Sequence, residues 1–259
     1  MEQNFTISDD KIKELTNISL KYSKIISQVI NEAEKNIVGQ KDIIKKIIIS
    51  IISDGHVLLE SVPGLAKTLM IKTMADIFSV NNVRMQFTPD LLPADIVGTK
   101  IYKSNTGTFE IQKGPIFHNF ILADEINRAP PKVQSALLEA MQEKQVSIHG
   151  ETFQLEKPFL VLATQNPIEN EGTYKLPEAQ VDRFALKILI TYPTKDQEIE
   201  IIKRNTINAE IKVTPILKLK EIIEMQKFNE EIYADNVILK YVASIVDATR
   251  NPSKYELDL

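Results

Sequence analysis

The chain contains no cysteine among its 259 residues. This absence excludes disulfides, thiol catalysis and metal sites that are built on cysteine. Histidine is also rare, since only His56, His118 and His149 are present, and their spacing matches no metal-ligand motif. We therefore interpret the three histidines as structural residues.

Long apolar segments are missing as well. The longest apolar runs, such as residues 47–52, are far too short to cross a bilayer. Residues 1–15 lack the apolar region of a secretory signal. We therefore expect a cytoplasmic protein with no membrane insertion.

An excess of basic residues is absent too, because the net charge is −4. The sequence has no basic, aromatic-rich stretch, which counts against a nucleic-acid partner. With 43% hydrophobic and 25% charged residues, the chain has the composition of a globular protein with a sizeable core. Its length suits one large domain or a main domain with a smaller one.

Short apolar runs alternate with amphipathic segments over most of the chain. The apolar runs predict strands at residues 56–60, 83–87, 120–123, 159–164 and 184–190. Helical spacing predicts helices from about residue 9 onward, and at 41–53, 67–78 and 130–143. Because strands alternate with helices, we predict an α/β fold in which a five-stranded parallel sheet lies between two layers of helices.

Two glycine turns predict β-hairpins inserted into this core, one around Gly107 and one around Gly150. Tyr102 and Phe109 near the tip of the first hairpin suggest a contact role, although an exposed structural ribbon is the alternative. Beyond Pro193 the pattern is helical only, with helices predicted at residues 196–204, 219–226 and 236–250. We therefore divide the chain into an N-terminal helical segment (1–36), a core (37–192) and a partial helical domain (193–259).

The first functional motif is the turn Ser-Val-Pro-Gly-Leu-Ala-Lys-Thr at residues 61–68, between a predicted strand and a predicted helix. This context is typical of a phosphate-binding loop, because backbone amides and a helix N-terminus favour anionic oxygens. Lys67 is then expected along the β and γ phosphates of a nucleoside triphosphate, and the Thr68 hydroxyl is expected to ligate magnesium. The strict motif has glycine where Ser61 and Ala66 stand, and a proline turn before a helix is the alternative. The candidate nucleotide-binding residues here are Ser61, Pro63, Gly64, Leu65, Ala66, Lys67, Thr68 and Leu69.

The second motif is the pair Asp124 and Glu125, which follows the apolar residues 120–123. Buried carboxylates are costly unless something compensates them. A magnesium ion held through water by Asp124, and an attacking water that Glu125 orients and deprotonates, would do so. A solvated acidic turn is the alternative. Because both motifs stand at strand ends, they favour hydrolysis of a nucleoside triphosphate, with Thr68 and Asp124 as candidate metal ligands.

Several longer segments resemble the MoxR branch of the AAA+ ATPases. They are residues 84–93 (RMQFTPDLLP), 124–132 (DEINRAPPK), 135–143 (SALLEAMQE), 163–167 (ATQNP) and 176–184 (LPEAQVDRF). The resemblance covers the chain from about residue 37 and implies an AAA+ three-layer αβα core with two inserted hairpins and a helical lid. It also implies ATP/ADP and Mg²⁺ as cofactors, a homo-oligomer that is usually a hexameric ring, and chaperone-like remodelling or maturation of partners, often von Willebrand factor A-domain proteins.

The resemblance assigns further catalytic roles. Asn166 matches sensor one, which holds the attacking water or the γ-phosphate, and a turn cap is the alternative. Arg183 matches the arginine finger that one subunit donates to its neighbour's nucleotide, and a surface ion pair is the alternative. Together with Lys67 and Glu125, these residues form the candidate catalytic set of an ATPase.

The segment Val38, Gly39 and Gln40 matches residues that lie along adenine in the family, and a simple turn between helices is the alternative. Family members continue into a lid helix with a Gly-Ala-Ser-Pro-Arg motif whose arginine is sensor two. This sequence reaches Leu259 before that motif, so we expect a partial, truncated lid. Two other functions stay open: a ring-type nucleic-acid motor, which shares hairpins of this kind, and a nucleotide-binding scaffold with little turnover.

Overall fold

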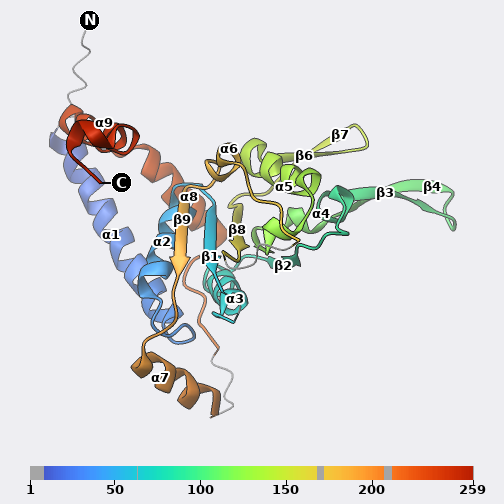
Figure 1. The fold of residues 1–259 in the computed structure, drawn as a ribbon, viewed down its shortest axis with the longest axis horizontal. Helices are drawn as coiled ribbons and strands as arrows, with labels where there is room; N and C mark the ends of the chain where they lie inside the picture. The colour runs from blue at the N-terminus through green and yellow to red at the C-terminus, as the bar shows by residue number, and fades with distance from the viewer. Residues whose placement is uncertain (1–8, 63, 168–171, 207–211, 259) are drawn as a thin grey trace, which may run out of the picture. The chain divides into compact units, whose positions relative to one another are not determined.

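The computed structural model describes residues 9–62, 64–167, 172–206 and 212–258 (Figure 1). It divides into two compact units, Met1–Gln226 and Lys227–Leu259. The second unit contains helix α9 (Asn236–Arg250) and the 3₁₀ turn η3 (Pro252–Tyr255). The division at residues 36 and 192 that we drew from the sequence stays a prediction.

A parallel sheet forms the centre of the first unit. Among the described residues it has five strands in the order β2–β5–β8–β1–β9 (Figure 1). The strands are β1 (Val57–Ser61), β2 (Asn82–Gln86), β5 (Phe120–Asp124), β8 (Leu160–Gln165) and β9 (Leu186–Ile190). Both faces of β5 are buried, as its continuous apolar run requires. The predicted parallel sheet is therefore confirmed.

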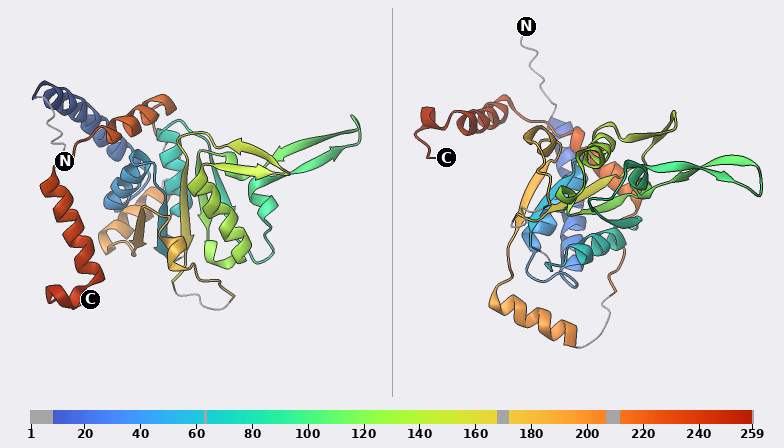
Figure 2. Two further views of the ribbon diagram at one scale, coloured as in Figure 1. Left: turned by 90° about the horizontal axis from the view of Figure 1, so that it is seen from above. Right: turned by 45° about the vertical axis from the view of Figure 1, so that its right-hand side comes forward.

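Helices cover both faces of this sheet (Figure 2). One face packs on α1 (Asp9–Ala33), α2 (Lys41–Ile52), α3 (Lys67–Ile77) and residues of α8 (Leu219–Glu230). The other face packs on α4 (Pro93–Val97) and α5 (Pro131–Glu143). Ile44, Ile47 and Ile51 recur at helical spacing on α2 and are buried, and each such side chain contributes about 1.5–3 kcal/mol when it leaves water. The predicted αβα layering follows from these two apolar cores.

The first unit also contains α6 (Glu178–Val181) and α7 (Lys195–Thr206). In the described ranges, no helix is both long and apolar enough to cross a membrane.

Both predicted hairpins are present as two-stranded antiparallel ribbons. The first pairs β3 (Gly98–Lys103) with β4 (Thr108–Lys113), and the second pairs β6 (Gln145–Ile148) with β7 (Glu151–Gln154). They extend from the same side of the sheet (Figures 1 and 2), and Lys100 of one approaches Glu151 of the other at 3.6 Å. Tyr102 and Phe109 are exposed on the first hairpin with their ring centres 5.2 Å apart.

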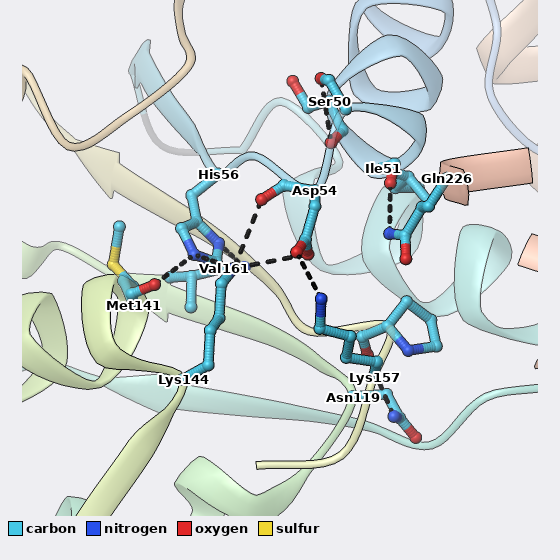
Figure 3. A network of polar contacts seen from close by, with 12 residues as sticks. Ser50, Ile51, Asp54, His56, Asn119, Met141, Lys144, Lys157, Val161 and Gln226 are labelled. Atoms are coloured by element: carbon cyan, nitrogen blue, oxygen red, sulfur yellow. Dashed lines mark hydrogen bonds and ion pairs between the residues drawn. The ribbon is translucent and has the colours of Figure 1, made fainter. Parts of the chain in front are cut away.

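A polar network closes the amino edge of the sheet (Figure 3). The backbone N–H of Val161 donates to Nδ1 of His56 at 3.1 Å, so Nε2 carries the proton and donates to the carbonyl of Met141 at 3.2 Å. Burial, with the nearby Lys144 ammonium, lowers the pKa of His56 to about 4. The buried His56 therefore ties β1, β8 and α5 together as a neutral ring, as expected of a structural residue.

Candidate functional site

Residues 64–66 lie between β1 and α3 at the carboxyl edge of the sheet and line two clefts. The first cleft has a volume of about 370 Å³. Its lining residues are Gly64, Leu65, Ala66, Lys67, Thr68, Arg84, Asp124 and Glu125. The two sequence motifs, 57 positions apart along the chain, therefore meet in one cleft.

The residues before α3 lead into the amino end of this helix, a position that favours an anion. Lys67 and Thr68 form the first turn of this helix, whose amino end carries partial positive charge. Ala66 adopts a left-handed conformation with φ 54°, which a non-glycine residue tolerates at a cost of roughly 1–2 kcal/mol. This geometry explains why the strict phosphate-loop motif has glycine here, and it shows that alanine still permits the turn.

The carboxylate of Asp124 lies at the end of β5 and is held from three sides. Thr164 donates to Oδ1 at 2.6 Å, and Arg84 donates to Oδ2 through Nε at 3.1 Å and Nη2 at 2.6 Å. The ammonium of Lys67 lies 3.7 Å from Oδ1. Burial raises the pKa of Asp124, but the hydrogen bonds from Thr164 and Arg84 and the charges of Lys67 and Arg84 outweigh it, so the pKa lies below its usual value. Asp124 is therefore held as an anion.

Glu125 follows in a strained backbone conformation, with φ 57° and ψ 49°. A left-handed non-glycine residue costs on the order of 1–3 kcal/mol and tends to occur at functional sites. Its backbone N–H donates to the Thr164 hydroxyl at 2.8 Å, and its carboxylate accepts from Gln86 Nε2 at 2.7 Å. Arg128 approaches the same carboxylate oxygen at 3.4 Å. The Glu125 residue lines the first cleft together with Asp124.

The second cleft adjoins the first, because both include Gly64, Leu65 and Ala66. Its volume is about 250 Å³. The remaining lining residues are Asn36, Ile37, Val38, Gln40, Leu69, Pro193, Ile201 and Arg204. The predicted adenine segment thus lies next to the predicted phosphate loop.

Helix α7 closes the second cleft through two contacts. Gly39 has φ 75°, and a Cβ atom there would lie only 2.3 Å from Cδ of Gln197. Arg204 donates from Nη1 to the carbonyls of Glu34 at 3.0 Å and Lys35 at 2.5 Å. These contacts fix α7 against the segment that follows α1.

The other predicted residues lie around this pair of clefts. Ser61 is buried at the end of β1, and its hydroxyl has no hydrogen-bond partner among the described residues. Asn166 is buried directly after β8, and Arg183 is exposed between α6 and β9. Within the described part of the chain, neither Asn166 nor Arg183 lines the two clefts. Pro63 lies outside the described residues.

Comparisons with known proteins show to which family the chain is similar. A family model, the ATPase family associated with various cellular activities (AAA), matches residues 56–186. The chain is 47% identical over 229 residues to Chaperone MoxR1 of Mycobacterium tuberculosis, an alignment that covers 88% of this chain and 60% of that protein. It is 42% identical over 234 residues to YeaC of Bacillus subtilis, with 90% of this chain and 73% of that protein covered.

The chain belongs to the MoxR family of AAA+ ATPases. A crystal structure of a candidate ATPase from Cytophaga hutchinsonii matches this MoxR-family chain with a TM-score of 0.86 and 50% identity, over 95% of this chain and 75% of the other. Protein MoxR of Methylorubrum extorquens is 32% identical over 167 residues. The chain spans about 60% of the length of the M. tuberculosis relative.

The donor set of this MoxR-family chain fits magnesium with a nucleotide. In the described ranges no three histidine or acidic side chains gather into a metal cluster. Magnesium, however, prefers one or two carboxylates together with substrate phosphates and water. Asp124 and the Thr68 hydroxyl line one cleft with Lys67, so substrate phosphates can supply the remaining oxygen ligands.

Three polar residues of this site carried no predicted role: Arg84, Gln86 and Thr164. Arg84 and Gln86 stand two residues apart on β2, so both side chains lie on one face of the strand. Gln86 is in register with Asp124. Thr164 stands in β8, the other neighbour of β5. The spacing of Arg84 and Gln86 was visible in the sequence, but their partners depend on strand order, which the sequence does not reveal.

Proposed function

We propose that this MoxR-family chain binds ATP with Mg²⁺, hydrolyses it to ADP and phosphate, and uses the cycle to remodel or mature partner proteins. The observation that carries the proposal is the convergence of Lys67 and Thr68 with Asp124 and Glu125 in one cleft. An ammonium, a hydroxyl and two carboxylates are the groups that ATP hydrolysis with magnesium requires.

The same geometry supports a role for this loop at the phosphate end of the nucleotide. Lys67 neutralises the β and γ phosphates, and the amides of residues 64–68 together with the α3 amino end complete an anion-binding loop. Thr68 and Asp124 would hold the magnesium ion, which supplies charge neutralisation between the phosphates when bound.

Hydrolysis needs a base and a stabiliser of developing charge. Glu125 lines the same cleft, and in the proposal it orients the attacking water and accepts its proton, an effect typically worth about 10²–10⁴-fold in rate. Asn166 positions the water or the γ-phosphate. Arg183 is exposed, as a residue that acts on a neighbouring subunit must be, so we propose a ring, usually hexameric, in which each subunit completes the next site.

The second cleft supports adenine as the base. The Oε1 atom of Gln40 is buried and accepts no hydrogen bond from any residue that the structure describes. A buried acceptor costs free energy unless a donor reaches it. The exocyclic amino group of adenine is such a donor, whereas the corresponding group of a 6-oxopurine is an acceptor.

A chaperone-like role rests on the family, since the M. tuberculosis relative is named a chaperone. We propose von Willebrand factor A-domain proteins as partners of this chain. The exposed pair Tyr102 and Phe109 on the first hairpin supports a protein-contact surface there, because aromatic residues are enriched at interfaces.

Two variants test the proposal. Lys67→Ala should abolish binding of a fluorescent ATP analogue, whereas Glu125→Gln should bind ATP and release phosphate at least a hundredfold more slowly, the lower bound for loss of a general base. Lys187→Ala, an exposed lysine outside both clefts, serves as a matched control. Unchanged phosphate release from Glu125→Gln would contradict the role of Glu125, and no nucleotide binding by the unmodified chain would contradict the function itself.

A further inference from the structure

Arg84 holds one oxygen atom of Asp124, the carboxylate that we propose as a metal ligand. Its guanidinium makes both hydrogen bonds to Oδ2, at 3.1 Å from Nε and 2.6 Å from Nη2. The other oxygen, Oδ1, accepts from Thr164, which is completely buried and also receives the backbone N–H of Glu125. Because Thr164 is fixed from two sides, Oδ2 is the oxygen of Asp124 that can change partner.

The guanidinium cannot release Oδ2 by losing its charge, because arginine stays protonated in proteins. A divalent cation beside the guanidinium is repelled by its positive charge. Mg²⁺ with its bound waters and the guanidinium of Arg84 would therefore compete for Oδ2.

Arg84 is also the partner that can move. Its side chain is 47% exposed, whereas those of Lys67 and Asp124 are each only 10% exposed. A long side chain on an exposed strand edge can change rotamer without unfolding its surroundings. Its Nη2 also donates to Oε1 of Gln86 at 2.6 Å, and Gln86 in turn holds Glu125.

We propose that Arg84 is a built-in counter-ion that competes with Mg²⁺ for Asp124 and is displaced when the metal–nucleotide complex binds. This inference rests on the proposed function of the cleft and adds a residue that sets its metal dependence. The displaced guanidinium also leaves Gln86, so arrival of the metal loosens the side chain that holds Glu125.

The test is the magnesium dependence of nucleotide binding rather than turnover. At saturating fluorescent ADP, the Mg²⁺ concentration that half-saturates the metal-dependent signal should fall about tenfold in Arg84→Ala, the size expected when one charge-assisted hydrogen bond is no longer broken. Arg84→Lys keeps the positive charge but lacks the planar guanidinium with its two adjacent donors. Its half-saturating Mg²⁺ concentration should lie between those of the unmodified chain and Arg84→Ala. Lys187→Ala, which also removes one positive charge from the sheet, should match the unmodified chain.

Thermal unfolding gives an independent readout. In EDTA, Arg84→Ala should unfold at a lower temperature, because Asp124 loses its main counter-ion, and Mg²⁺ with ADP should raise its Tm more than that of the unmodified chain. A half-saturating Mg²⁺ concentration for Arg84→Ala that is equal to or higher than that of the unmodified chain would overturn the proposal, even if nucleotide binding itself is intact. If the unmodified chain binds no nucleotide with or without Mg²⁺, the proposed function fails instead.

Discussion

The hydroxyl of Thr164 donates a hydrogen bond to Oδ1 of Asp124 at 2.6 Å. The same hydroxyl accepts the backbone N–H of Glu125 at 2.8 Å. One buried group on β8 thus fixes both members of the acidic pair at the end of β5.

Thr164→Val keeps the shape of this side chain and removes its hydroxyl. The variant leaves Oδ1 of Asp124 without this donor and the N–H of Glu125 without this acceptor, so the free energy of unfolding should fall by about 2 kcal/mol. Urea unfolding of the variant and of the unmodified chain measures this difference in unfolding free energy. Thr164→Ser keeps the hydroxyl and should lose less than the valine variant; the reverse order would show that methyl packing, not hydrogen bonding, dominates at this position.

Gly39 and Gln197 are packed so closely that a single methyl group does not fit between them. Gly39→Ala would place Cβ 2.3 Å from Cδ of Gln197 and would hold alanine at φ 75°. The left-handed conformation alone should cost about 1–2 kcal/mol in unfolding free energy. Nucleotide affinity should fall as well, because Val38 and Gln40 on either side line the second cleft.

The double variant Gly39→Ala with Gln197→Ala separates the two causes. Gln197→Ala alone loses the hydrogen bond from the Thr194 N–H at the start of α7, at 2.9 Å, and should cost about 1 kcal/mol. If the clash matters, the double variant will be more stable than the sum of the single effects predicts. Strict additivity would assign the whole effect to backbone strain.

The centre of the sheet could be predicted because β1, β5 and β8 are short apolar runs that are buried along almost their whole length, and periodicity detects such runs. Helices α4 (Pro93–Val97) and α6 (Glu178–Val181) were not predicted, because four or five residues are too few for helical spacing to show. The strand order does not follow from local sequence, because β1 (Val57–Ser61) lies between β8 (Leu160–Gln165) and β9 (Leu186–Ile190), which are far from it along the chain. Only the contacts among distant segments decide that order.

The candidate site also has a part that could be predicted from local sequence and a part that depends on contacts between distant segments. Lys67, Thr68, Asp124 and Glu125 stand in continuous motifs, so their meeting in one cleft could be predicted from the sequence, whereas their chemical roles stay predictions. The charge balance of Asp124 could not, because Arg84 reaches it from the neighbouring strand β2. Arg183 stays a prediction, since its expected target belongs to another subunit.

Gln40 should select the base. Gln40→Leu removes the buried acceptor at nearly constant size, so ATP affinity should fall about tenfold, the effect typical of one hydrogen bond of about 1.4 kcal/mol. ITP, with an oxygen in place of the amino group, should bind the unmodified chain more weakly than ATP, and the leucine variant should lose this preference. Gln40→Glu, which has only acceptor atoms, should keep it. An equal affinity of the unmodified chain for ATP and ITP would exclude base selection by Gln40.

His56 should make folding sensitive to mild acid. Its pKa is lowered by burial to about 4 in the folded chain, against about 6.5 in an unfolded chain. The neutral ring therefore contributes its full stability above pH 6.5, and this contribution is lost as the pH falls toward 4, by up to about 3 kcal/mol at 1.36 kcal/mol per pKa unit.

Urea unfolding of the unmodified chain and of His56→Gln, at several pH values between 7.5 and 4.5, checks this prediction, with His149→Gln at an exposed position as the control. The difference in unfolding free energy between the unmodified chain and His56→Gln should shrink steadily toward low pH, and a constant difference would mean that His56 does not stay neutral in the folded chain.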